Sequence, residues 1–238
     1  MCGIFGIYGG PTVDLVELAS LGLLSSRRGR DSSGLVHLDG DSYRVVRADM
    51  PIDKLIAGSK WKSSSLIAGH TRLITDGEAD NQPVIRDGII TLHNGIIVNP
   101  EDYWKESSLE RMYQIDTEVI VALTLDYLGK NCPLEDLYRY IVGNCKGSLS
   151  CAILIPKLGK MVLMSNNGSL YLGKKNEHSY FASEHSFLSN LGVNSIEQLV
   201  GSRVIDVPFS NKEIMLSEKK VTRNSLIPAL SKASDGSK

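Results

Sequence analysis

The sequence has 238 residues, 42% of them hydrophobic and 22% charged, so it can bury the core of one large or two small globular domains. Its 26 basic and 27 acidic residues give a net charge of -1, which offers no electrostatic case for nucleic acid or an anionic membrane as partner. No apolar run approaches the ~20 residues that cross a bilayer, and the N-terminus lacks the basic segment of a signal peptide, so we expect a cytoplasmic protein.

The first half of the sequence predicts short strands and one amphipathic helix. Apolar residues recur at helical spacing over residues 13–27, and Thr12 is a candidate for the N-cap of this helix. Asp39-Gly40-Asp41 and Asp87-Gly88 are typical of tight turns. Alternating or continuous apolar residues predict strands at residues 2–9, 33–38, 43–48, 66–70 and 89–93.

The second half predicts two helices followed by more strands, and therefore an α+β fold with largely antiparallel pairing. Helices are expected at 115–128 and at 133–142, the latter with Pro133 in its first turn. We expect one domain over residues 2–225 and a small, polar C-terminal tail over 226–238. The further strands are expected at 149–155, 161–165, 169–173, 179–183 and 203–207.

The four cysteines argue against a metal site. They form no C-x-x-C pair and have no histidine at metal-ligand spacing, and a disulfide framework is not expected in a reducing compartment. Cys145 and Cys151 are interpreted as small core residues. We therefore expect neither a metal nor another cofactor.

Cys2 differs from the other cysteines because it directly follows Met1. Removal of Met1 would give Cys2 a free α-amine beside its thiol, and such an amine titrates near ~7.7–8.0, so it can act as a general base. One residue would then supply both nucleophile and base. Gly3 would let a substrate approach the backbone closely.

Three polar segments, 28–34, 69–77 and 93–95, follow predicted helices or strands. Each alone is typical of caps and turns. Together with Cys2, however, their order resembles the class II glutamine amidotransferases, and within them the glutaminase domain of glucosamine-6-phosphate synthase. The resemblance covers roughly the first half of the chain and rests on the segments MCGIFGI, RRGRDSSGL, GHTRLITDGE, LHNGII and IDTEVI.

The resemblance implies a catalytic residue set and a fold. Cys2 would attack the carboxamide of L-glutamine, and Asn94 and Gly95 would form the oxyanion hole. Arg72 would bind the substrate α-carboxylate and Asp116 its ammonium group. The implied fold is a four-layer αββα sandwich of two antiparallel sheets, as in N-terminal-nucleophile hydrolases. Arg28, Asp31 and Gly34 would hold the loop around Cys2.

Two further candidates follow Arg72 in a segment that departs from the family pattern at Leu73 and Asp76. Thr75 would assist at the α-carboxylate, and Asp76 stands where the sugar-phosphate synthase has a histidine. Leu73 likewise replaces an aromatic residue. These departures leave the contact of Asp76 with substrate open and argue against naming the chain a sugar-phosphate synthase.

The acceptor of the ammonia also stays open. Hardly any sequence remains after the glutaminase portion, and it contains neither a G-x-x-x-x-G-K-[ST] phosphate loop nor a Ser-Gly-Gly-x-Asp segment for ATP. The chain would pass ammonia to a separate synthase or use glutamine by itself. The alternatives are another N-terminal-nucleophile amidohydrolase or a non-catalytic binding relative. The Arg72 and Asp116 pair disfavours the first, and retention of Cys2, Asn94 and Gly95 disfavours the second.

Overall fold

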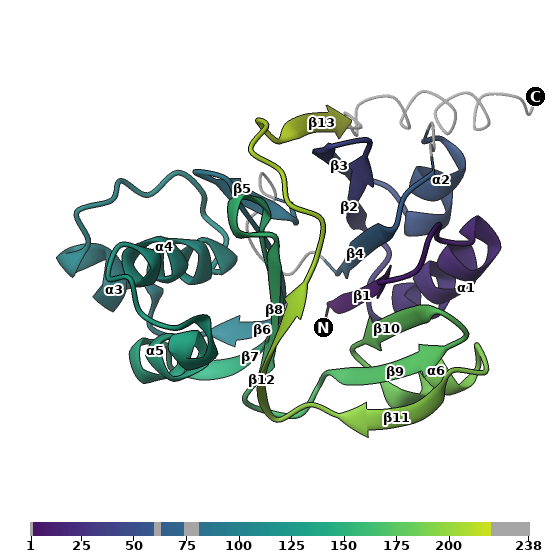
Figure 1. The fold of residues 1–238 in the computed structure, drawn as a ribbon. Coiled ribbons are helices and arrows are strands. Elements are labelled where there is room, and N and C mark those ends of the chain that lie inside the picture. The colour runs from purple at the N-terminus through teal and green to yellow at the C-terminus, as the bar shows by residue number, and fades with distance from the viewer. Residues whose placement is uncertain (1, 60–62, 74–80, 220–238) are drawn as a thin grey trace, which may run out of the picture.

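Two β-sheets lie face to face between two groups of helices (Figure 1). The computed structural model describes residues 2–59, 63–73 and 81–219. Everything said below of the structure refers to these residues, so Thr75, Asp76 and the predicted tail lie outside it. The four layers confirm the αββα sandwich of an α+β fold.

The larger sheet has eight strands in the order β11-β9-β10-β1-β4-β2-β3-β13. Its central strand, β1, pairs antiparallel with β4 and β10. The one parallel pair among the described strands of this sheet joins β13 to β3. The strands are β1 (Gly3–Tyr8), β2 (Ser32–Asp39), β3 (Ser42–Ala48), β4 (Leu66–Arg72), β9 (Tyr171–Lys175), β10 (His178–Ala182), β11 (Asn194–Gln198) and β13 (Met215–Lys219).

The smaller sheet has five strands in the order β12-β8-β7-β6-β5, and all its described pairs are antiparallel. Its longest strands, β6 and β7, run side by side at the centre. The strands are β5 (Val84–Arg86), β6 (Ile89–Ile97), β7 (Gly147–Ile155), β8 (Lys160–Ser165) and β12 (Gly201–Asp206).

Helices cover the outer face of each sheet (Figure 1). The larger sheet is covered by α1 (Leu15–Ser25), α2 (Ile52–Ala57) and α6 (His185–Ser189). The smaller sheet is covered by α3 (Pro100–Glu106), α4 (Thr117–Leu128) and α5 (Leu137–Asn144). Single 3₁₀ turns lie at Ser26–Arg28, Leu134–Asp136 and Pro156–Leu158. Of the helices described, none has the length and apolar character needed to span a bilayer.

Alternation of side chains along the strands builds three apolar layers. Successive residues of a strand point to opposite faces of the sheet. In β1, Ile4 packs between the two sheets, whereas Phe5 packs against the helices of the larger sheet. In β7, Leu154 likewise packs between the sheets and Ile153 against α4 and α5. Strands buried on both faces explain why the sequence shows near-continuous apolar runs there.

Several local predictions are wrong in their bounds or caps. The helix predicted at 133–142 begins only at Leu137, after the 3₁₀ turn Leu134–Asp136, so Pro133 does not lie in its first turn. Asp14, not Thr12, caps α1, because its Oδ1 accepts a hydrogen bond from the backbone N–H of Val16 at 2.7 Å. The strand predicted at 89–93 continues to Ile97, since β7 pairs with it along its whole length. Residues 93–95 therefore lie within β6 rather than after it. The predicted turns at Gly40 and Gly88 are confirmed by their left-handed φ angles, 66° and 81°.

The interpretation of Cys151 as a core residue is confirmed, since it is fully buried, and Cys145 packs against the same apolar layer with partial exposure. Burial raises the pKa of the Cys145 thiol to about 12 and also raises that of Cys151. Neither thiol is therefore a ready nucleophile at neutral pH.

Candidate functional site

Cys2 lies in a cavity of about 300 Å³ at the N-terminal end of β1. The cavity brings together four predicted site residues from distant parts of the chain. Cys2 precedes β1, Arg72 ends β4, Gly95 lies in β6 and Asp116 precedes α4. The full lining is Cys2, Arg72, Leu73, Gln82, His93, Gly95, Ile96, Ile97, Gln114, Ile115 and Asp116.

Arg28 fixes the backbone of Cys2. Its Nε donates a hydrogen bond to the carbonyl oxygen of Cys2 at 2.6 Å, and its guanidinium pairs with Glu184 at 2.7 Å. This contact supports the prediction that Arg28 holds the loop around Cys2. Burial raises the pKa of the Cys2 thiol, and a hydrogen bond from the backbone of Leu73 partly opposes this shift. The thiol is therefore protonated at neutral pH and needs a base before it can attack.

The turn that contains Gly29 and Asp31 holds the end of β4 where Arg72 stands. The backbone N–H of Asp31 donates to the carbonyl oxygen of Arg72 at 2.9 Å. A Cβ on Gly29 would lie 2.3 Å from the carbonyl carbon of Arg72, so this approach requires glycine. Gly34 is equally restricted, since a Cβ there would lie 1.9 Å from the carbonyl oxygen of Gln82.

Gly3 has a different role from the one expected. A Cβ on Gly3 would lie 2.4 Å from Oγ of Ser25 and 2.9 Å from Oγ1 of Thr71. The space beside Gly3 is therefore filled by the end of α1 and by β4, and not left for a substrate. Its small size lets β1 pack closely on these elements.

Asn94 and Gly95 lie on neighbouring positions of β6, but only Gly95 lines the cavity. The buried side-chain amide of Asn94 donates to Oγ of Ser183 at 3.4 Å, and the same Oγ accepts from the backbone N–H of Ile4 at 2.9 Å. Asn94 is therefore directed toward β1, next to the residue that follows Gly3. Gly95 packs tightly on β7, since a Cβ there would lie 2.0 Å from the carbonyl oxygen of Ser148.

Asp116 presents a charged carboxylate to the cavity. Its Oδ2 accepts from the backbone N–H of Ile97 at 2.8 Å, and its Oδ1 lies 3.7 Å from Nδ1 of His93. Burial alone would raise the pKa of Asp116, but the nearby His93 and hydrogen bonds from the backbone of Ile97 and Thr117 outweigh it and lower the pKa below its ordinary value. The site therefore holds an anion suited to an ammonium group.

Sequence reasoning missed Gln82 and His93, which support the cavity floor. The side chain of Gln82 pairs with the backbone of His93, donating to its carbonyl oxygen at 3.0 Å and accepting from its N–H at 2.6 Å. This side chain thus continues the strand pairing of β5 and β6. His93 belongs to the LHNGII segment, whereas no local pattern marks Gln82.

Buried His70 should make the free energy of unfolding fall in acid. It is fully buried in β4, and burial, together with the nearby charge of Arg72, lowers the pKa of His70 to about 3. Unfolded histidine titrates near ~6.5, so below that pH the unfolded chain binds a proton that the folded chain does not. The free energy of unfolding should fall by about 1.4 kcal/mol per pH unit between these two values.

We expect the His70→Met variant to lose this pH dependence of the free energy of unfolding. Urea unfolding at pH 7 and pH 5 should show that wild type loses roughly 2 kcal/mol more than the variant over this interval. Equal acid sensitivity of the two proteins would show that His70 is protonated as easily in the folded as in the unfolded chain.

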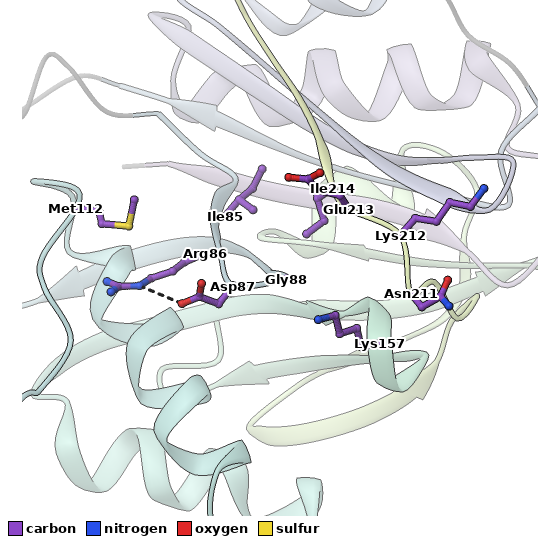
Figure 2. A pocket seen from close by; sticks show the side chains of 10 residues that line it. All are labelled: Ile85, Arg86, Asp87, Gly88, Met112, Lys157, Asn211, Lys212, Glu213 and Ile214. Atoms are coloured by element: carbon purple, nitrogen blue, oxygen red, sulfur yellow. Dashed lines mark ion pairs between the residues drawn. The ribbon is translucent and has the colours of Figure 1, made fainter.

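A second and larger cavity, of about 560 Å³, lies beside β5 (Figure 2). The residues that line it include no cysteine, serine or histidine, and two of its positively charged side chains already form ion pairs within the protein. Arg86 pairs with Glu118, and Lys212 pairs with Asp41. In the described part of the chain, no three His, Cys, Asp or Glu side chains are grouped to hold a metal ion. The Cys2 cavity is therefore the better candidate.

Comparison with known protein families gives a match to a glutamine amidotransferase domain over residues 70–190. A glutamine–fructose-6-phosphate aminotransferase (isomerizing) of Xylella fastidiosa is 32% identical over 197 residues, which cover 79% of this chain and 32% of that protein. A 7-cyano-7-deazaguanine synthase of Saccharolobus solfataricus is 29% identical over 97% of this chain and 50% of its own. The chain thus spans a third to a half of these relatives.

Solved structures share the fold. Glutamine phosphoribosylpyrophosphate amidotransferase from B. subtilis matches with a TM-score of 0.67 at 21% identity, over 90% of this chain and 51% of that one. A predicted glutamine amidotransferase from Pseudomonas aeruginosa matches with a TM-score of 0.54 at 15% identity, over 89% of this chain and all of that one. Together, the matching family, the four layers and the cavity around Cys2 place this chain among the class II glutamine amidotransferases.

Proposed function

We propose that the chain hydrolyses L-glutamine to glutamate and ammonia at the Cys2 cavity, once Met1 has been removed. The observation that carries this proposal is that a thiol, a guanidinium and a carboxylate, from Cys2, Arg72 and Asp116, line one cavity of about 300 Å³. This set matches the reactive carboxamide and the zwitterionic end of a free amino acid.

The chemistry begins at Cys2. Its α-amine takes the thiol proton, and the thiolate attacks the side-chain carboxamide carbon of glutamine. The tetrahedral intermediate expels ammonia, with the proton returned by the amine, and leaves a γ-glutamyl thioester. Water then attacks the thioester carbon, glutamate leaves and the thiol is restored. The backbone N–H of Gly95 and the Asn94 amide, which has a second N–H besides the one it donates to Ser183, stabilise the oxyanion in both halves of the reaction.

Arg72 and Asp116 select the substrate. The planar guanidinium of Arg72 suits bidentate binding of the α-carboxylate, and the Asp116 carboxylate suits the α-ammonium. Thr75 assists at the α-carboxylate, and Asp76 stands beside it in the sequence. A substrate that carries an amide but no amino acid head group would gain no contact from either charge, so it should be rejected.

The ammonia passes to an aminating synthase. Both relatives are longer than this chain, which matches about a third of the fructose-6-phosphate aminotransferase and half of the deazaguanine synthase. The partner is therefore a separate synthase, or a further synthase domain, that aminates a small molecule or a modified nucleotide. Exposed Leu73 and Ile96 form an apolar rim at the cavity, where such a partner would keep ammonia from water.

Substitutions of the head-group residues test this function. Arg72→Met and Asp116→Asn should each raise KM for glutamine roughly 10- to 100-fold, because each removes a charge-assisted contact worth about 1.5–3 kcal/mol. Steady-state release of glutamate gives KM and kcat for each variant. Wild-type turnover of simple amides as fast as of glutamine would favour another amidohydrolase, and tight glutamine binding without turnover would favour a non-catalytic relative.

A further inference from the structure

The segment between α3 and α4, residues 107–116, carries three residues of the Cys2 cavity although it forms neither helix nor strand. Its last residues, Gln114, Ile115 and Asp116, line the cavity directly. A segment without a ladder of backbone hydrogen bonds must satisfy its N–H groups elsewhere. What holds this segment therefore helps to place the Asp116 carboxylate, which the N–H of Ile97 in β6 also contacts.

Glu118 supplies those missing acceptors. It lies in the first turn of α4 and is fully buried. Its carboxylate accepts hydrogen bonds from the backbone N–H of Met112 at 2.9 Å and of Tyr113 at 2.8 Å. The side chain thus folds back onto the segment that leads into its own helix, and a carboxylate in this position also interacts favourably with the helix N-terminus.

Arg86 completes the arrangement from β5. The same terminal nitrogen of its guanidinium donates to Oε1 of Glu118 and to the carbonyl oxygen of Glu110, both at 2.8 Å. Its side chain is only 8% exposed. Figure 2 shows Arg86 beside Met112 at the edge of the second cavity, with its ion pair to Asp87 drawn. The pair therefore joins β5, the 107–116 segment and α4.

From these contacts we propose that Arg86 and Glu118 are positioning residues for the amino acid head group of the substrate, acting through Asp116. This inference rests on the proposed glutaminase function. Neither residue lines the Cys2 cavity, so they do not touch the reacting atoms. Loss of the pair loosens the cavity wall that carries the head-group carboxylate and weakens substrate binding, and it leaves the chemistry at Cys2 intact.

The geometry also explains why a buried ion pair stands here at all. Replacing such a pair with apolar side chains is often neutral for stability, so stability alone does not require it. The Glu118 carboxylate accepts hydrogen bonds from the backbone N–H groups of Met112 and Tyr113. Apolar side chains could not accept these hydrogen bonds. The pair therefore fixes a particular backbone path.

The test compares Glu118→Gln and the double variant Arg86→Gln/Glu118→Gln with wild type. The double variant carries no unpaired buried charge, so it guards against simple unfolding. We expect KM for glutamine to rise about tenfold, equivalent to ~1.4 kcal/mol, with kcat within about threefold of wild type. Amide hydrogen exchange at Met112 and Tyr113 should accelerate, while exchange in β6 and β7 stays unchanged.

Glu17→Gln is the control, because Glu17 forms a less buried ion pair with Lys175 and lies in α1, in the helical layer of the other sheet. It should change neither KM nor exchange at Met112. An unchanged KM in both Glu118 variants of an active enzyme overturns the positioning inference alone. Absence of glutamine turnover in wild type overturns the proposed function, and with it this inference.

Discussion

Cys2→Ala is expected to abolish glutamine hydrolysis, with a loss of roughly 10⁴-fold or more in kcat, because no other thiol of the described residues lines the cavity. The fold should survive, since Cys2 belongs to none of the three apolar layers and is held through its backbone carbonyl by Arg28. Glutamate release measures the activity, and thermal unfolding measures the fold.

Cys132→Ala serves as the control for this loss. Cys132 is exposed and lies between α4 and α5, away from the Cys2 cavity, so its removal should leave turnover unchanged. Turnover by Cys2→Ala at the wild-type rate would mean that another residue attacks glutamine. Loss of activity together with a large fall in Tm would instead indicate a structural role for the Cys2 side chain.

Asn94→Ala is expected to lower kcat by about 10²–10³-fold with little change in KM, as for loss of one oxyanion donor. The donor is needed only when charge develops on the substrate oxygen, so ground-state binding of glutamine should be preserved. Steady-state kinetics separate the two parameters.

The Ser183→Ala variant distinguishes a catalytic role of Asn94 from a structural one. Because Asn94 donates to Oγ of Ser183, replacing Asn94 also disturbs a buried contact with the residue that follows β10 and, through it, with Ile4 of β1. If that contact were the reason for the loss, Ser183→Ala would lower kcat as much as Asn94→Ala. We expect Ser183→Ala to retain most of its activity, and an equal loss in the two variants would contradict the oxyanion role.

Local sequence patterns predicted much of the sheet core but less of its edges. The hairpin of β2 and β3 and the strands β1, β7 and β8 follow from alternating or continuous apolar residues and glycine turns. β11 (Asn194–Gln198) has mostly exposed side chains, and β5 has three residues, so neither carries a readable period. The four-layer arrangement came from family resemblance, since periodicity does not say which strands pair.

The residues of the site were also predictable only in part, because local sequence patterns do not show which distant segments come together. Cys2, Arg72, Gly95 and Asp116 belong to recognisable segments, and the structure brings them to one cavity. The residues that support them come from unrelated parts of the chain. Glu184 lies far along the sequence from Arg28, as Ser183 does from Asn94. Such pairs are created by tertiary folding, and no local spacing encodes them.

The role of Cys2 as an N-terminal nucleophile is tested by combining an intact-mass measurement with labelling by an electrophile that mimics glutamine. We predict that the active protein lacks Met1 and takes up one label, on Cys2, and that excess glutamine prevents the labelling. Cys145 and Cys151 should stay unlabelled, because burial holds their thiols in the protonated form. An active protein that keeps Met1, or a label on any other cysteine, would show that Cys2 is not the N-terminal nucleophile.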